Sequence, residues 1–271
     1  MRRMCAFLVV FAVAAFSLRA VADVTPASLF QDNMVLQQGI KVPVWGTAAP
    51  DEKVTVTFGK QTKQAVAGKD GKWRLSLDAL KAEPNQAPQE MTIAGKNTIT
   101  ITNVLVGEVW ICSGQSNMEL PLAAANNGKT EVDQANFPAI RMFAVGKAPS
   151  AVPQEKCAGS WAVCEPGKCG GFSAVGYFFA RNLHQQLNVP VGMINASWGG
   201  TPAEPWTEIG FLKKMPIFQE RIAKYEAAVA EYNANKDAYE AKRKDAAKKA
   251  EEAKAQWSQQ QIDTDPGMQG K

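Results

Sequence analysis

Apolar and polar residues alternate in short runs through the first third of the chain, as they do in half-buried β-strands. Turn residues separate these runs: Asp70-Gly71 is the strongest short signal for a hairpin, and Ala94–Asn97 predicts a second turn. The strand-like runs are Val42–Gly46, Val54–Phe58, Trp73–Leu77, Met91–Ile93 and Ile99–Thr102. Strands of this length and spacing predict a small β-sandwich domain over residues 23–106.

Two tryptophans of this predicted domain have alternative roles. If exposed, Trp45 or Trp73 would offer an aromatic surface to a sugar ring. Large aromatic side chains more often fill a core, so we expect both tryptophans to be buried in the sandwich. The pattern alone does not assign a function to the domain.

The pattern changes after residue 106, where apolar strands alternate with helical segments. The strands expected here are 109–112, 140–145 and 189–195. Residues 171–187 predict an amphipathic helix with an apolar stripe of Phe172, Val175, Phe179, Leu183 and Leu187. Because strands that alternate with helices form parallel sheets, we assign residues 107–210 to an α/β domain.

The segment after the first of these strands contains a candidate catalytic serine. Val109–Cys112 runs into a tight turn, Ser113–Gln115, and Ser116 opens the next element. A serine on such a turn has its hydroxyl exposed, and the following helix end offers unpaired N–H groups to a developing oxyanion. The alternative is that Ser116 only caps a helix, which is a common role of serine.

A second turn, Gly199-Gly200, follows the last of these strands. Thr201, Pro202 and Glu204 have the order of an N-cap, a first helical residue and a capping-box acid, so we expect a helix to begin here. The turn is then either an oxyanion cradle or an ordinary tight connection. In a parallel sheet this turn and Ser116 lie at the same carboxyl edge, where ligands bind.

The C-terminal part of the chain is rich in Ala, Lys, Glu and Gln. Residues 211–257 have high helix propensity and several opposite charges four residues apart, but little apolar surface to bury. We therefore expect a charged, solvated helical insertion rather than a coiled coil, which would need sustained heptads. Residues 258–271 have no periodicity and are predicted to be irregular.

Residues 1–22 have the features of a secretory signal peptide. Arg2 and Arg3 precede the apolar run Phe7–Phe16, and Ala20–Ala22 is a small-x-small cleavage site. Cleavage removes three of the 30 basic residues and none of the 26 acidic ones, which leaves a net charge of +1. This charge gives no support for nucleic acid as a partner. We expect a secreted or periplasmic protein that is not held in a membrane after signal cleavage.

Four cysteines follow the predicted signal peptide. Cys112 lies in an apolar strand and is expected to be a buried thiol. Cys157, Cys164 and Cys169 lie close together in a chain that we expect to be exported, so one local disulfide fits the sequence, with its pairing left open. No histidine accompanies them, and we expect neither a zinc site nor another metal site.

Five motifs that follow one another along the chain carry more information than their local spacing. They are Phe30–Gln37, Val44–Gly46, Gly107–Met118, Phe172–Phe179 and Val189–Thr201. In this order, between Leu29 and Trp206, they resemble the sialate O-acetylesterase family, whose members are exported esterases of the SGNH (GDSL-like) hydrolase superfamily. The resemblance implies a three-layer α/β/α domain with a parallel sheet behind the β-sandwich.

The resemblance also implies an activity, the removal of O-acetyl groups from sialic acids or other acetylated glycans, without a metal or cofactor. Ser116 matches the family's nucleophile, which would attack the acetyl carbonyl and form an acyl-enzyme that water hydrolyses. The N–H groups of Ser116 and Gly200 would form the oxyanion hole, with Gly199 as the second choice. Weaker candidates for substrate contacts are Gln115, Asn117 and Trp198.

The family's general base is not found among these residues. Two later family motifs, Gln-Gly-Glu-Ser and Asp-x-x-His, do not occur, and the single histidine, His184, lies on the polar face of the predicted helix 171–187. We therefore expect an α/β domain that is incomplete in this chain, through a truncated gene model, a split gene or a fragment, and a 271-residue product without esterase activity. The alternatives are a non-catalytic glycan-binding protein with a degenerate pocket, and an esterase that takes its base from a second polypeptide or from His184. The sequence leaves the oligomeric state open.

Overall fold

The computed structural model describes residues 23–150 and 153–264. These residues form two compact units, which divide between Gly200 and Thr201. The predicted signal peptide lies outside the described residues, so export stays a prediction. Within the described part of the chain, no helix has both the length and the apolar character needed to cross a membrane.

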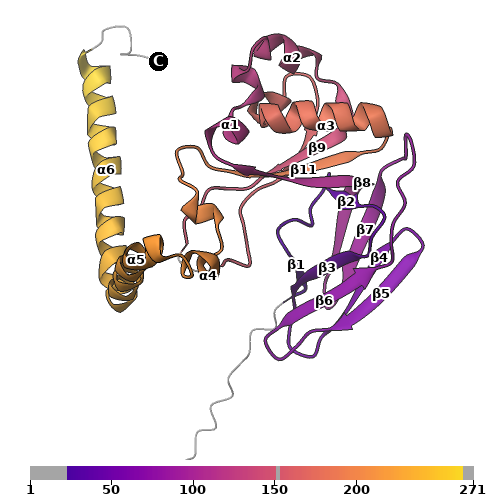
Figure 1. Cartoon of the computed structure of the whole chain (residues 1–271), viewed down its shortest axis with the longest axis horizontal. Coiled ribbons are helices and arrows are strands. Elements are labelled where there is room, and N and C mark those ends of the chain that lie inside the picture. Colours follow the sequence, from indigo (N-terminus) through magenta and orange to yellow (C-terminus); the bar gives the residue numbers. More distant parts are fainter. Residues whose placement is uncertain (1–22, 151–152, 265–271) are drawn as a thin grey trace, which may run out of the picture. The chain divides into compact units, whose positions relative to one another are not determined.

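Strands β1 to β7 make up the β-rich half of the first unit (Figure 1). They are β1 Thr25–Pro26, β2 Val35–Gln37, β3 Val42–Thr47, β4 Lys53–Phe58, β5 Gln61–Val66, β6 Lys72–Leu77 and β7 Gln89–Ala94. β1, β3 and β6 form one sheet, and β4, β5 and β7 belong to a larger sheet that continues through β8 (Thr98–Gly114). Buried residues of both sheets share one core cluster. All five predicted strand runs lie within these strands.

The Asp70-Gly71 turn forms, but it does not close the predicted hairpin. Gly71 has a φ of +75°, and the N–H of Lys72 donates to the Asp70 carboxylate (3.1 Å). β4 pairs with β5 instead, and β6 pairs with β3 in the other sheet. The prediction was wrong because β5 alternates only between partly buried and exposed residues, so it lacks the apolar signal of a strand.

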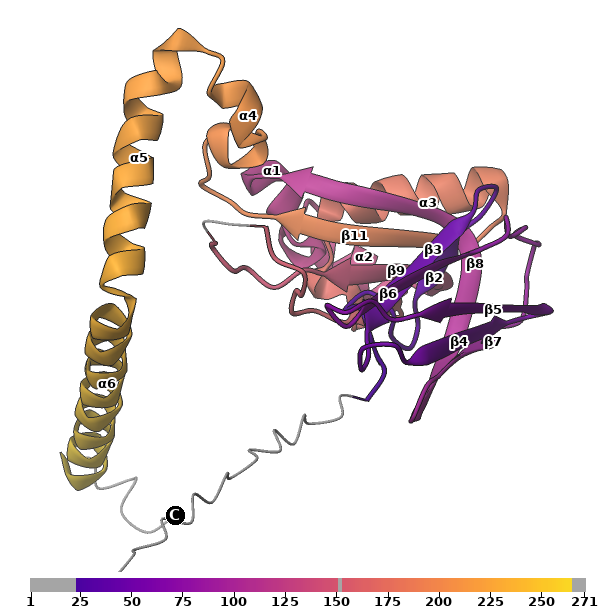
Figure 2. The ribbon, with the colours of Figure 1, turned by 90° about the horizontal axis from the view of Figure 1, so that it is seen from below.

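β8 joins the two halves of the first unit (Figures 1 and 2). It pairs first with β7 in antiparallel orientation, then with β2, and over residues 108–114 in parallel with β11 (Val191–Ser197). Gly107 lies at the change of partners, where a Cβ would overlap the backbone carbonyl of Pro190. The boundary predicted at residue 106 therefore lies inside one continuous strand.

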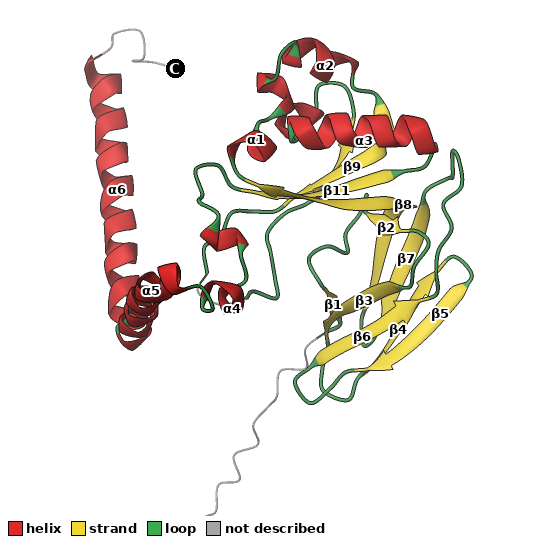
Figure 3. Ribbon diagram, viewed as in Figure 1, coloured by secondary structure: helices red, strands yellow, loops and turns green. Residues whose placement is uncertain are grey.

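A parallel sheet covered by helices forms the α/β half of the first unit (Figure 3). The strand order is β9, β11, β8, all parallel, with β10 antiparallel at the outer edge of β9. The bounds of these elements are β9 Phe137–Ala144, β10 Trp161–Cys164, α1 Ser116–Glu119, α2 Gly128–Gln134 and α3 Ala174–Leu187, with 3₁₀ turns at Leu122–Ala124 and Cys169–Gly171. Helices α1 to α3 lie on one face of the sheet. The parallel sheet is as predicted, whereas the three-layer arrangement stays a prediction.

The face of α3 that packs on the sheet differs from the predicted apolar stripe. Tyr177 and Ala180 are fully buried, whereas Val175 and Phe179 are 47% and 41% exposed. A Cβ at Gly176 would lie 3.0 Å from the sulfur of Cys112 on β8. Because the helix approaches the sheet this closely at Gly176, the small residues Gly176 and Ala180 face the sheet there, and Tyr177 packs beside them.

All four cysteines of the described residues are free thiols. Cys112 is buried, as predicted, and burial raises its pKa to about 11. Burial raises the pKa of Cys164 to about 12, with a smaller contribution from its neighbour Cys169, to which it is hydrogen-bonded. Cys157 is partly buried in the loop between β9 and β10.

The second unit is helical in its described residues. It contains a 3₁₀ turn, Glu204–Trp206, followed by α4 Ile209–Leu212, α5 Pro216–Ala234 and α6 Lys236–Thr264. α5 and α6 lie where the charged helical segment was predicted, and α6 continues past residue 258 to Thr264. The glutamines after Ser258 sustain a helix, and the first strong helix breakers are Pro266 and Gly267. Residues 265–271 lie outside the described part.

Candidate active site

The carboxyl ends of β8, β11 and β9 meet at one edge of the parallel sheet. The strand register places Gly114 opposite Ser197 and Asn195 opposite Ala144. Beyond the strands, the N–H of Trp198 donates to the carbonyl of Gly114 (2.9 Å). The turns that follow β8 and β11 therefore lie side by side, as the parallel-sheet argument predicts.

Ser116 is the first residue of α1, and it is exposed. The N-cap of this helix is Gln115, so the alternative role of Ser116 as a cap is not observed. The Ser116 hydroxyl donates to Oε1 of Gln115 (2.8 Å). Its backbone N–H lies in the first helical turn, where no intrahelical acceptor exists. An exposed hydroxyl thus lies beside an N–H group that has no acceptor within its helix.

Glu119, the last residue of α1, ties the two turns together. One carboxylate oxygen accepts a hydrogen bond from the N–H of Gly199, and the other pairs with the ammonium of Lys147. The Lys147 hydrogen bond, followed by that of Gly199, lowers the pKa of Glu119. A Cβ at Gly199 would overlap this carboxylate and make an ordinary contact, 3.6 Å, with the Ser116 Cα, so a larger residue there would displace the Glu119 carboxylate.

The two glycines of the second turn differ in what their N–H groups do. The Gly199 N–H is occupied by Glu119, whereas the Gly200 N–H has no acceptor among the described residues. Gly200 has a φ of +77°, which favours glycine, and a Cβ built on it would meet nothing within 4 Å. Of the two predicted oxyanion donors, the geometry favours Gly200. We refer to Ser116, Glu119, Lys147, Gly199 and Gly200 together as the Ser116 edge.

Sequence reasoning missed Glu119 and Lys147. Lys147 follows β9, the third parallel strand, and the carboxyl end of that strand opens at the same edge as the other two. A residue just after the third parallel strand was therefore a candidate for this edge. The Lys147 ammonium also lies 5.8 Å from the ring centroid of Trp198, which is partly buried at this edge. Asn117 is exposed on α1.

The α-helix predicted to begin at Thr201 does not form. The Thr201 hydroxyl accepts a hydrogen bond from Nε1 of Trp206 (2.8 Å), and the Glu204 carboxylate pairs with Arg221. Glu204 opens only a 3₁₀ turn. The prediction failed at Pro205, because proline has no N–H to donate to the Thr201 carbonyl and its ring would clash with that carbonyl in an α-helix. No α-helix N-terminus therefore follows the Gly199-Gly200 turn directly.

His184 lies at the opposite end of the sheet from Ser116. Its Nδ1 is 2.7 Å from the carbonyl oxygen of Val189, which precedes the amino end of β11. Ser116 follows the carboxyl end of the neighbouring parallel strand, and β11 is 7 residues long. At the rise of a β-strand this length separates the two ends by about 20 Å. His184 is therefore not positioned to take a proton from Ser116.

The sequence model of one family, described as carbohydrate esterase, sialic acid-specific acetylesterase, matches residues 106–242, half of the chain. The chain belongs to this carbohydrate esterase family. The matched range contains every residue of the Ser116 edge. Membership was expected from the motifs, and it is confirmed.

Named relatives of this esterase family support the assignment. The chain is 33% identical to sialate O-acetylesterase from Rattus norvegicus over 205 residues, covering 69% of this chain and 38% of the relative. It is 30% identical to the Homo sapiens protein of the same name over 219 residues, covering 74% and 42%. The chain thus spans well under half the length of these relatives.

A solved structure of similar fold is a carbohydrate acetylesterase from Xanthomonas citri. It aligns with a TM-score of 0.68 and 36% sequence identity, over 70% of this chain and 44% of the other. The mixed α/β architecture with several helices is thus shared with a carbohydrate acetylesterase.

Proposed function

We propose that the Ser116 edge is the nucleophile and oxyanion half of a serine esterase that removes O-acetyl groups from sialic acids or other acetylated glycans. One observation carries the proposal. The Ser116 hydroxyl and the Gly200 N–H lie on neighbouring turns, and Glu119 ties these turns together through Gly199. Family membership supports the choice of an acetyl ester as substrate.

The proposed reaction is a two-step acyl transfer. The Ser116 oxygen attacks the acetyl carbonyl while its proton passes to a general base, and the sugar oxygen leaves protonated. The N–H groups of Ser116 and Gly200 donate to the oxyanion of the tetrahedral intermediate, each contributing about 10²–10³ in rate. Water then releases acetate from the acyl-enzyme. Gln115 holds the serine hydroxyl through its side-chain oxygen before the substrate binds.

We propose that the general base and the second helical layer of an SGNH-type three-layer domain come from polypeptide outside these 271 residues. The reason is positional: the one histidine of the sequence is bonded to Val189 at the far end of the sheet. The 271-residue protein should then show no Ser116-dependent hydrolysis of an acetyl ester by itself.

Chemical rescue tests this proposal on the chain as it stands. Imidazole added to the buffer would replace the absent base, and acetate release from an O-acetylated sialic acid is measured with and without it. We expect a Ser116-dependent rate that appears only with imidazole, since a general base contributes about 10²–10⁴. Ser116→Ala should remove this rate, and Ser113→Ala, an exposed serine on β8, should keep it.

Two results would overturn the proposal. Ser116-dependent turnover without imidazole would mean that the chain already contains a base. Equal rates for the wild type and Ser116→Ala at every imidazole concentration would mean that the edge does not activate an ester. The second result would favour a protein that binds glycans without cleaving them.

A further inference from the structure

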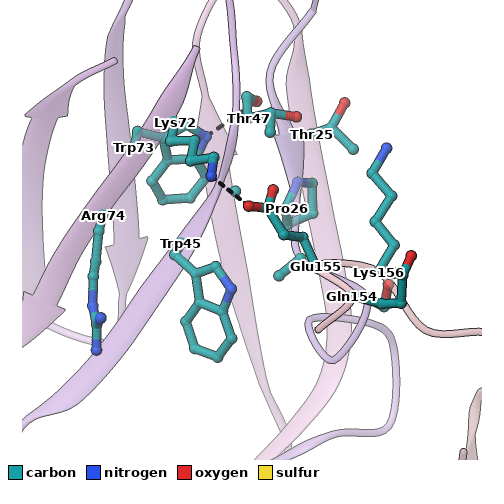
Figure 4. A pocket seen from close by; sticks show the side chains of 13 residues that line it. Thr25, Pro26, Trp45, Thr47, Lys72, Trp73, Arg74, Gln154, Glu155 and Lys156 are labelled. Carbon is teal, nitrogen blue, oxygen red and sulfur yellow. Dashed lines mark hydrogen bonds and ion pairs between the residues drawn. The ribbon is translucent and has the colours of Figure 1, made fainter. Parts of the chain in front are cut away.

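A cleft lies on the outer face of the β3–β6 strand pair in the first unit. Its volume is about 670 Å³, and it is lined by β1, β3, β6 and by residues 154–156 of the loop between β9 and β10 (Figure 4). We call it the Trp45 cleft, after the aromatic residue on its wall. No residue of the Ser116 edge lines it, and a volume of this size is typical of small-molecule sites.

The register of two strands places the side chains of the cleft on one face. Trp45 lies opposite Arg74, and Thr47 lies opposite Lys72, in the antiparallel pair of β3 and β6. Residues two apart on a strand share a face, so all four side chains point outward. Trp73, between Lys72 and Arg74, points into the core, and its Nε1 donates to the Thr47 carbonyl (3.1 Å).

Both tryptophans were predicted to be buried in the core, and this holds for only one of them. Trp73 is 2% exposed, as predicted, whereas Trp45 is only partly buried. Phe30 contacts the Trp45 ring edge to face, with centroids 4.9 Å apart. This contact fixes the indole while part of its surface stays open to the cleft.

The loop that forms the other wall is anchored to the β-rich half. The N–H of Cys157 donates to the Ser28 hydroxyl (3.2 Å), and the side-chain amide of Gln31 donates to the carbonyl of Gly159 (3.2 Å). These bonds flank residues 154–156 on their C-terminal side. The cleft is therefore bounded by two attached walls.

The charges of the cleft are unbalanced toward the positive. Glu155 pairs with Lys72, and this contact, drawn as a dashed line in Figure 4, raises the pKa of Lys72. Arg74 and Lys156 also line the cleft, and neither makes an ion pair with another described residue. Three cations and one anion give the lining a net charge of +2. An anionic ligand is therefore favoured over a neutral one.

We propose that the Trp45 cleft is a second, non-catalytic binding site for a carboxylate-bearing sugar unit. The guanidinium of Arg74 would bind the sugar carboxylate through a bidentate pair of hydrogen bonds. The exposed part of the Trp45 indole would pack against the apolar face of the sugar ring. Lys156 would add positive charge from the facing wall. The choice of a sugar rests on membership of a carbohydrate esterase family, and not on Ser116 being the nucleophile.

Calorimetric titration of the 271-residue protein tests the site with defined probes. N-acetylneuraminic acid and glucuronic acid carry the carboxylate, and glucuronamide is the neutral counterpart of the second. We expect the two acids to bind with dissociation constants below about 10 mM and the amide to bind at least about tenfold more weakly. Ligand-observed NMR should detect the same order.

Variants of one exposed arginine locate the binding. Arg74→Met should weaken the binding of both acids at least about tenfold and leave the amide unchanged. Arg74→Lys, which keeps the charge but loses the bidentate contact, should be intermediate. Arg243→Met on α6 is the matched control and should bind as the wild type does. Circular dichroism checks that each variant is folded.

The results separate this site from the Ser116 edge. Ser116→Ala should bind the acids with unchanged affinity, whatever the outcome of the imidazole experiment. The proposal is overturned if the acids do not bind, if the acid and its amide bind equally, or if Arg74→Met binds the acids as tightly as the wild type.

Discussion

The Ser116 edge and the Trp45 cleft present polar groups in two different ways. At the edge the donors are backbone N–H groups at the ends of parallel strands, and two of them belong to glycines. At the cleft the donors are long side chains that alternate along regular antiparallel strands. Adding a Cβ should therefore disturb the edge, whereas shortening a side chain should remove binding from the cleft without unfolding it.

The two regions nevertheless share one device, a glycine where two segments approach closely. Gly199 lies against a side-chain carboxylate that has freedom to move, whereas Gly46, beside Trp45, lies against backbone atoms. A displaced side chain costs less free energy than a displaced strand. We therefore expect the structure around the Trp45 cleft to be more sensitive to a Cβ at Gly46 than the Ser116 edge is to a Cβ at Gly199.

Gly46→Ala should have the largest effect on stability. Its Cβ would overlap the carbonyl oxygen of Thr25 and lie 2.8 Å from the Cα of Pro26 and 2.9 Å from the Trp73 ring. Forcing β1 away from β3 should lower the free energy of unfolding by about 3 kcal/mol and the melting temperature by about 6–12 °C. Thermal unfolding measures this.

Gly171→Ala is the control for this substitution, because a Cβ there meets nothing within 4 Å. Its melting temperature should stay close to that of the wild type. Equal melting temperatures for Gly46→Ala and Gly171→Ala would contradict the view that a backbone contact supports the cleft.

Gly200→Ala should lower the catalytic rate at the Ser116 edge by more than its loss of folding stability explains. Gly200 and Gly167 have nearly the same φ, +77° and +76°, and at neither position would a Cβ meet an atom within 4 Å. Alanine at either position should therefore cost about 1 kcal/mol of folding free energy. Only Gly200→Ala should also lower the imidazole-rescued, Ser116-dependent rate, by about 10²-fold.

Comparing Gly200→Ala with Gly167→Ala shows whether a loss of rate comes from the position of the Gly200 N–H or from general backbone strain. Unfolding experiments should give the two alanine variants similar losses. If Gly167→Ala reduces the rescued rate as much as Gly200→Ala does, the Gly200 N–H is not an oxyanion donor.

The sequence predicted those parts of the fold that follow from local alternation. The strands of the β-rich half and the parallel sheet carry their own periodic signals, and the motif around Ser116 was long enough to identify the family. β5 was missed because its residues are mostly polar on both faces. The pairing of β6 with β3 depends on contacts between distant segments, which no local pattern records.

The candidate site could be predicted only where its residues follow the carboxyl ends of parallel strands, because those ends meet at one edge of the sheet. The proximity of Ser116 and the Gly199-Gly200 turn followed from parallel strands. Which of the two glycine N–H groups has an acceptor among the described residues did not. Glu119 occupies the Gly199 N–H, and its own partner, Lys147, comes from a third strand end. The helix expected after Thr201 does not form because Pro205 follows Glu204. The prediction gave more weight to the capping pattern than to this proline.

Glu119→Gln should have the smallest effect and tests the link between the two turns through its pH dependence. Lys147 and the Gly199 N–H lower the pKa of Glu119, so the folded protein resists protonation at pH values where the unfolded chain takes up the proton. The stabilisation is therefore complete above the ordinary glutamate pKa and is lost as pH falls through the folded pKa.

Melting temperatures between about pH 7 and about pH 3 measure this loss. The wild type should be slightly more stable than Glu119→Gln at neutral pH, because the pair is surface-exposed and partly screened. This difference should shrink on acidification, since the wild-type carboxylate becomes neutral like the amide. Glu165→Gln, which breaks an exposed pair with Lys168, is the control and should follow the wild-type profile more closely. Parallel profiles for the wild type and Glu119→Gln would mean that the charge on Glu119 does not hold the Ser116 edge together, and contacts such as the Trp198–Gly114 hydrogen bond would then position the turn after β11.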